Sequence, residues 1–113
     1  MYEPVVLPHF IRQVRAYAKK YRYLNDAVAD TLDDFHKEQH ARLRGNMYKV
    51  RLRTKDMARG KSSAFRLIVL IVEIKSYVIP VTLYFKGDKV NITKKELNQH
   101  MEIILLELAK KEI

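Results

Sequence analysis

The chain has 113 residues, of which 48% are hydrophobic and only three are glycine and three proline. This composition excludes a disordered tail and predicts one domain, residues 1–113, with a single ordinary core. There is no cysteine, so disulfides and thiolate metal sites are excluded, and the longest apolar run, residues 67–72, is shorter than the roughly 20 residues needed to cross a bilayer. The net charge of +9 favours a polyanionic partner, and we expect a cytoplasmic protein that does not contact a membrane.

The first 46 residues predict a short strand followed by two helices. Residues 2–7 are β-prone, and Pro8 suits the first turn of a helix. Apolar residues then recur at helical spacing as far as Tyr21. A second helix is expected to begin at Asn25 or Asp26, which are both good N-caps, and to end at the pair Gly45-Asn46, because glycine is common just past a helix.

His36 and His40 lie four residues apart in this second predicted helix, a spacing that can bind a metal ion. No third ligand is evident nearby except Glu38 on another face, and an exposed polar pair is the better explanation of the spacing. We therefore expect no metal and no cofactor.

The segment from Arg42 to Arg66 holds nearly all of the net positive charge. It contains nine basic residues and one acid, Asp56, for a net +8, whereas the rest of the chain has thirteen basic and twelve acidic residues. Within it, residues 48–53 (YKVRLR) alternate apolar and cationic side chains, which predicts a strand with one buried and one cationic face. The cationic face is expected to bind phosphates; a solvated outer face would also alternate, but it would not explain the lack of acids.

The rest of the chain predicts two further strands and a helix. Residues 54–63 are expected to form a loop, residues 65–72 a central strand covered on both faces, and residues 78–85 its partner, with Pro80 indicating a bulge, an edge or a late strand start. Thr93 and Glu96 match a capping box at the start of a C-terminal helix. The predicted order β-αα-βββ-α is an α+β fold, with helices packed on a small, mostly antiparallel sheet.

These strands predict one site. If the three strands pair with their faces aligned, cations and a phenol converge on a single concave surface that suits a phosphodiester: Lys49, Arg51, Arg53, Arg66, Tyr84 and Lys86. The alternative for Arg66 is a strand-end arginine held in a structural salt bridge. Arg44, Lys55 and Lys61, from the same basic segment, are expected to bind further phosphates of the same ligand.

Three short stretches resemble motifs of the RelE/ParE superfamily of bacterial and archaeal toxins: YKVRLR at residues 48–53, SAFRLI at 63–68 and LYFK at 83–86. In addition, NITKKEL at residues 91–97 is similar to the ending of HigB-type members. The resemblance covers residues 47–97 in motif and most of the chain in element order. It implies the toxin of a type II toxin–antitoxin system that cleaves mRNA, in many members on the ribosome, and that is neutralised by a cognate acidic antitoxin protein.

The resemblance also implies roles for individual residues. Lys49 and Arg51 match the family's paired basic residues, one of which acts as general base, and Arg66 matches the arginine that holds the scissile phosphate. Tyr84 falls near the family's variable acid positions and is our candidate proton donor or base-stacking platform. Positive charges crowded around a lysine favour its neutral form, whereas arginine keeps its proton, so Lys49 is the better candidate base. The implied reaction is metal-free attack of a ribose 2′-OH on the adjacent phosphate, which leaves a 2′,3′-cyclic phosphate.

The chain departs from the family pattern at Ser63-Ala64, where members carry Gly-Gly or Ser-Gly, and in the length of the preceding loop and of the last helix. Two alternatives therefore stay open. One is a non-enzymatic module of the same fold that binds nucleic acid or, like ParE toxins, poisons gyrase. The other is a basic structural domain without catalysis.

Overall fold

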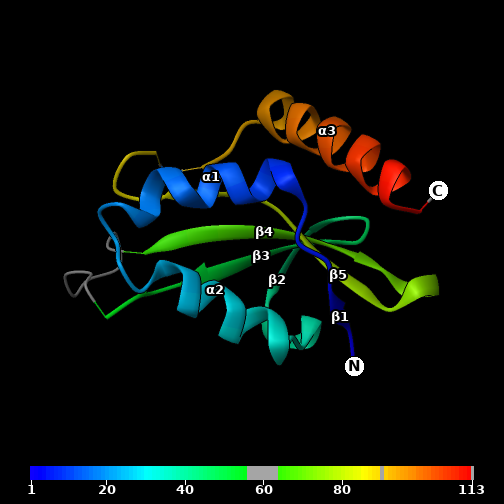
Figure 1. Ribbon diagram of the computed structural model, residues 1–113, viewed down its shortest axis with the longest axis horizontal. Coiled ribbons are helices and arrows are strands. Elements are labelled where there is room, and N and C mark those ends of the chain that lie inside the picture. Colours follow the sequence, from blue (N-terminus) through cyan, green and yellow to red (C-terminus); the bar gives the residue numbers. More distant parts are fainter. Residues whose placement is uncertain (56–63, 90, 113) are drawn as a thin grey trace.

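The computed structural model describes residues 1–55, 64–89 and 91–112. Their three α-helices are arranged around one five-stranded sheet (Figure 1). The elements in chain order are β1 (Glu3–Pro4), α1 (Pro8–Ala18), α2 (Leu24–Asp33), η1 (Lys37–Gln39), β2 (Ala41–Arg44), β3 (Met47–Leu52), β4 (Phe65–Val72), η2 (Glu73–Lys75), β5 (Tyr77–Phe85) and α3 (Lys94–Glu112).

The strand order in the sheet is β1-β5-β4-β3-β2. Strands β1 and β5 pair in parallel, and the other neighbours in this order are antiparallel. The predicted α+β class and the predicted pairing of three consecutive strands are therefore confirmed. Strand β4 lies in the middle, as its nearly continuous apolar sequence requires.

Each face of the sheet carries its own hydrophobic core. One face packs against α1 and α2, with Phe10, Leu24 and Phe65 fully buried in it. The other face packs against α3 through Leu97 and Ile104. In β4 and β5 both faces are buried, because helices cover both sides of the sheet there.

The second helix is shorter than predicted, and this prediction was wrong. Helix α2 ends at Asp33, and the chain then forms η1 and strand β2, which makes a hairpin with β3. The pair Gly45-Asn46 is the hairpin turn rather than the end of a helix, with Gly45 at φ +50°. Glycine serves both purposes, and the alternation of Arg42, Leu43 and Arg44 was the signal that favoured a strand.

This correction also separates the two histidines. His36 and His40 flank η1 instead of sharing a helical face. His36 Nε2 lies 3.1 Å from the Asp34 carboxylate, and the ring of His40 stacks on that of Phe35 with centroids 5.1 Å apart. No group of three or more potential metal ligands occurs among residues 1–55, 64–89 and 91–112.

A β-bulge interrupts the pairing of β4 with β5. Val69 pairs with Pro80, but the next pair is Ile68 with Thr82, so Val81 is the extra residue. The bulge fits one of the three explanations predicted for Pro80, because proline cannot donate to the ladder. On α1, Gln13 lies beside this region: its side-chain amide donates to the Val81 carbonyl at 3.1 Å, and its oxygen accepts from the Thr82 hydroxyl at 2.5 Å.

Helix α3 is attached to the start of α1 by polar contacts. The N-cap residue of α1 is Leu7, whose side chain cannot accept a hydrogen bond, and the Glu107 carboxylate of α3 accepts the backbone N–H of His9 at 2.9 Å. His9 Nε2 and His100 Nδ1 are 2.8 Å apart. A negative charge at a helix N-terminus is favourable, so Glu107 stabilises α1 as well as the docking of α3. None of the helices in the described part of the chain is long and apolar enough to span a membrane.

Candidate phosphate-binding site

Three predicted site residues form a row across the sheet. Arg51 of β3 pairs with Arg66 of β4, and Arg66 pairs with Tyr84 of β5. Directly paired residues point to the same face of a sheet. The structure therefore brings these three side chains together in the predicted register.

Lys49 lies in the adjacent row, paired with Ile68, which in turn pairs with Thr82. It points to the same face as Arg51, and alternate residues of a strand are about 6.5–7 Å apart. Ile68 and Thr82 are buried, whereas Lys49 is half-buried. Lys49 thus lies between the part of this face that α3 covers and the row of Arg51, Arg66 and Tyr84, which we call the cationic row.

Exposure decreases along the row from β3 to β5. Arg51 is exposed, Arg66 is half-buried and Tyr84 is 4% exposed. The cationic end is accessible to a ligand, while the phenol lies at the inner end. A phosphate could therefore enter beside Arg51 and reach Arg66 and the Tyr84 hydroxyl.

Among the residues that the structure describes, the Arg66 side chain has a donor with no hydrogen-bond partner. Its Nη1 is buried and makes no hydrogen bond, and the ion pairs found among the described residues do not include Arg66. A buried donor without an acceptor costs roughly 1–3 kcal/mol, so such groups in native proteins call for an explanation. The salt-bridge alternative for Arg66 finds no carboxylate partner in that part of the chain, and an anionic ligand would satisfy the donor.

Burial raises the pKa of Tyr84 above its ordinary value, and the positive charges of Arg66 and Lys89 act in the opposite direction. The phenol is therefore protonated at neutral pH. Its hydroxyl lies 3.5 Å from the side-chain oxygen of Asn91, and the Lys89 ammonium lies 5.7 Å from the ring centroid.

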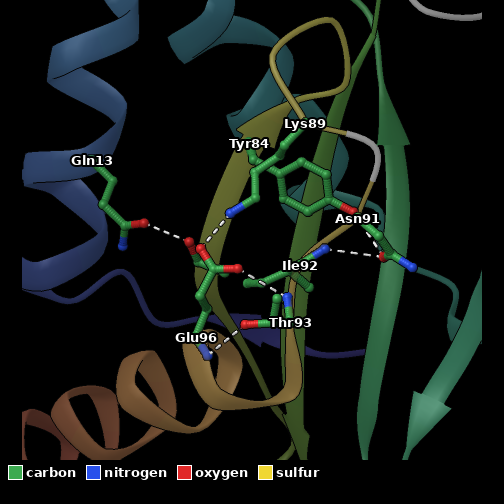
Figure 2. A network of polar contacts seen from close by, with 8 residues as sticks. Gln13, Tyr84, Lys89, Asn91, Ile92, Thr93 and Glu96 are labelled. Carbon is green, nitrogen blue, oxygen red and sulfur yellow. Dashed lines mark hydrogen bonds and ion pairs between the residues drawn. The ribbon is translucent and has the colours of Figure 1, made fainter.

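The segment that follows β5 is fixed to the start of α3 by a polar network (Figure 2). The predicted capping box is confirmed: Glu96 N–H donates to Thr93 Oγ1 at 3.1 Å, and Thr93 N–H donates to Glu96 Oε1 at 3.0 Å. The Lys89 ammonium donates to the other Glu96 oxygen at 2.5 Å. This contact and the capping hydrogen bonds lower the pKa of Glu96 to about 2. The network holds Lys89 and Asn91 against Tyr84.

The other predicted phosphate-binding residues are distributed around this row. Arg44 and Lys49 line one groove, between the β2–β3 hairpin and the start of α3. Arg53 and Lys55 line another, of about 630 Å³, between the end of β3 and α2, which Arg51 also lines. Two carboxylates, those of Asp26 and Asp30, line this second groove as well.

Arg53 follows the end of β3 and lines the groove beside α2 together with Arg51, so its convergence with the row stays a prediction. Lys86 follows β5 and donates its backbone N–H to the Ala64 carbonyl at 2.9 Å. Lys61 and most of the predicted 54–63 loop lie outside the described residues.

The sequence analysis missed Asn91 and Lys94 at this site. Both residues were noted only as part of the stretch NITKKEL at residues 91–97. A signal for Lys94 was present: Lys94 and Lys95 occupy the first turn of α3, where the helix dipole disfavours cations. No comparable signal pointed to Asn91, whose role depends on how the chain turns after β5.

The fold is that of a small α+β protein with a row of cations on one face of its sheet. The structure is similar to a mutant of the E. coli toxin RelE in the free state, with a TM-score of 0.51, 18% identity, and coverage of 79% of this chain and 87% of that one. It also matches a chain of the intact E. coli RelBE toxin–antitoxin complex, with a TM-score of 0.48, 19% identity, and coverage of 74% and 94%. No curated protein sequence matches significantly. Residues 9–113 match the family described as "RelE toxin of RelE / RelB toxin-antitoxin system", and the chain belongs to this family.

Proposed function

We propose that this RelE-family toxin is an endoribonuclease that cleaves mRNA, with or without the ribosome as platform. The observation that carries the proposal is the row Arg51–Arg66–Tyr84, in which two guanidinium groups and a protonated phenol share one face and Arg66 keeps a buried donor without a partner. Guanidinium groups bind phosphate with paired hydrogen bonds, and their positive charge stabilises the additional negative charge of a phosphorane-like transition state.

The reaction proceeds without a cofactor in this proposal. The ribose 2′-oxygen attacks the adjacent phosphorus, the bond from phosphorus to the 5′-oxygen of the next nucleotide breaks, and a 2′,3′-cyclic phosphate forms. Arg66 and Arg51 hold the non-bridging oxygens. The Lys49 side chain accepts the 2′-OH proton, and Tyr84 donates a proton to the departing 5′-oxygen. Lys49 and Tyr84 come from the two strands that flank β4, so they can act on opposite sides of the phosphorus.

We also propose a cognate antitoxin as protein partner. The family is described as the toxin of a toxin–antitoxin system, and the exposed cations of β2 and β3 suit an acidic, amphipathic segment. An antitoxin that covers Arg51 would exclude RNA from the row. Failure of an adjacent acidic gene product to co-purify with the toxin would reject this partner.

Expression of the parent beside Arg66→Ala and Lys49→Ala tests the activity. The parent is expected to arrest growth and to leave mRNA fragments with 2′,3′-cyclic phosphate and 5′-hydroxyl ends, and both variants are expected to lose this. Lys75→Ala is the control, because Lys75 is an exposed cation in η2, outside the row and its flanking grooves. If the parent arrests growth but RNA stays intact and DNA is damaged, the gyrase-poisoning alternative is supported and the nuclease proposal fails.

A further inference from the structure

A groove of about 310 Å³ lies beside the cationic row, between the β2–β3 hairpin and the start of α3. Three cations from three different elements line it: Arg44 from β2, Lys49 from β3 and Lys94 from α3. The described residues that complete its walls are apolar or neutral: Leu43, Asn91, Ile92, Thr93 and Leu97. With no carboxylate among these lining residues, the groove differs from the one beside α2, where Asp26 and Asp30 balance the cations.

The helix that borders the groove contributes no carboxylate to its described lining, because Glu96, the acid in the first turn of α3, is paired with Lys89. Lys94 and Lys95 begin α3, and the N-terminus of a helix already carries a partial positive charge. Arg44 is held toward α3 by a hydrogen bond from its guanidinium to the side-chain oxygen of Asn98. The groove therefore concentrates positive charge that an anion would stabilise.

Asn91 adds a directed donor to the groove. Its side-chain oxygen accepts the Ile92 N–H at 3.1 Å and lies 3.5 Å from the Tyr84 hydroxyl. Because a backbone N–H can only donate, this contact fixes which end of the amide is oxygen. The amide nitrogen is turned away from Tyr84 (Figure 2), and no hydrogen bond to it is found among the described residues. Asn91 thus contacts Tyr84, at the inner end of the cationic row, and also lines the groove.

We infer that this groove binds the backbone phosphate of the nucleotide next to the scissile one, with Lys94 and Asn91 as ligand-binding residues. The inference rests on the proposed function and extends it. Lys49 lies between the two sites, about 6.5–7 Å from Arg51 along β3, a separation close to that of successive phosphates in an extended single strand. A single-stranded RNA held by Arg51 and Arg66 therefore continues past Lys49 toward Lys94. A single strand is the form of RNA that such a path can accept.

Binding of a non-cleavable RNA tests the inference separately from catalysis. A fluorescein-labelled octanucleotide of mixed sequence with 2′-O-methyl groups cannot react, and its affinity is measured by fluorescence anisotropy at several salt concentrations. Lys94→Ala is expected to weaken binding about fivefold to tenfold, the effect of one lost charge-assisted contact. The slope of log affinity against log salt should fall by about 0.7, the value for one phosphate of a single strand. Lys95→Ala is the matched control, since it removes the same charge from the next residue, which does not line the groove, and should change affinity less than about twofold.

Asn91→Asp gives a second, nearly isosteric test. Aspartate keeps an oxygen for the Ile92 N–H and the Tyr84 hydroxyl but replaces the amide nitrogen by a negative oxygen, so RNA binding should weaken more than about tenfold. Thermal unfolding of each variant checks that it is folded. If Asn91→Asp proves unstable, the comparison of Lys94→Ala with Lys95→Ala decides the inference, because both lysines are exposed and neither change should affect folding. Equal affinities and slopes for Lys94→Ala and Lys95→Ala would overturn the inference, even if the parent binds and cleaves RNA. A parent that binds no RNA would reject both this inference and the proposed function.

Discussion

Arg51 and Arg66 are direct cross-strand partners on neighbouring antiparallel strands. Like charges in this position are destabilising by roughly 0.2–1 kcal/mol. Arg66 adds the cost of a buried donor without a partner. The two arginines therefore lower the free energy of unfolding, a cost that is common at functional sites.

Replacing Arg66 should therefore separate activity from stability. In Arg66→Met, the free energy of unfolding is expected to stay the same or to rise by up to about 1 kcal/mol, because the like-charge pair and the unpaired donor disappear while the apolar stem is kept. RNA cleavage is expected to fall at least about a hundredfold. Urea unfolding and cleavage assays on the same preparations measure the two effects. A loss of stability of several kcal/mol would instead indicate a structural role for Arg66.

The Lys89–Glu96 contact predicts a pH dependence at low pH. The pKa of Glu96 is lowered from 4.5 to about 2, first by the hydrogen bond from Lys89. A carboxylate with a lowered pKa in the folded state stabilises the protein above its ordinary pKa, and this contribution is lost as the pH falls from 4.5 to about 2. Glu96→Gln keeps an oxygen for the Thr93 N–H but removes the charge. Its thermal midpoint should lie below that of the parent at pH 7 and approach it near pH 2.

The control for this experiment is Lys89→Gln, which removes the other partner. It should reduce the pH dependence in the same range, because the contact with Lys89 is the main cause of the lowered pKa of Glu96. If both variants keep the pH profile of the parent, the contact does not contribute in solution.

The His9–His100 pair predicts a second pH dependence, at mildly acidic pH. Burial is the main cause that lowers the pKa of both imidazoles. For His9, Glu107 opposes this and Arg12 reinforces it. For His100, the charges of His9 and Lys89 reinforce it and Glu96 opposes it. Because the folded-state pKa values lie below the ordinary 6.5, the stabilisation is complete above that value and is lost as the pH falls below it. Two protonated rings would also place hydrogens on both nitrogens of the 2.8 Å contact.

Chemical unfolding between pH 7.5 and 5 measures this effect. His100→Gln should show a weaker loss of stability across the range than the parent, and His36→Gln, which changes an exposed histidine outside the pair, is the control. Burial also lowers the pKa of His40, so part of the pH dependence should remain in both variants. Identical profiles for His100→Gln and His36→Gln would contradict the role of the pair.

The hairpin turn predicts a purely conformational effect at Gly45. Its φ is +50°, and a Cβ added there would meet no atom within 4 Å. Gly45→Ala should therefore cost roughly 1–2 kcal/mol through the left-handed backbone alone, and Gly45→Asn should cost less because asparagine tolerates this region. Urea unfolding of the two variants checks the order. Equal costs would mean that the backbone conformation is not the cause.

Most of the sheet could be predicted from the sequence, because its signals are local. The alternation of residues 48–53 and the apolar run of residues 65–72 each determine a strand and its buried face, and aligning those faces was enough to place Arg51, Arg66 and Tyr84 together. The start of α3 followed from Thr93 and Glu96 for the same reason.

The errors arose where one sequence feature fits two structures. Gly45-Asn46 suits a helix end and a hairpin turn, and only the pairing of β2 with β3 decides between them. Asn91 is brought to Tyr84 by the path of the chain between β5 and α3, and no periodicity encodes such a path.

The bulge at Val81 determines which side chain faces Arg66. If the pairing continued without interruption from Val69 and Pro80, Leu83 would be the partner of Arg66. Tyr84 would then point to the opposite face of the sheet, toward α1 and α2, where Leu83 now packs. The chemistry of this surface thus depends on a single unpaired residue in a strand that carries none of the cations.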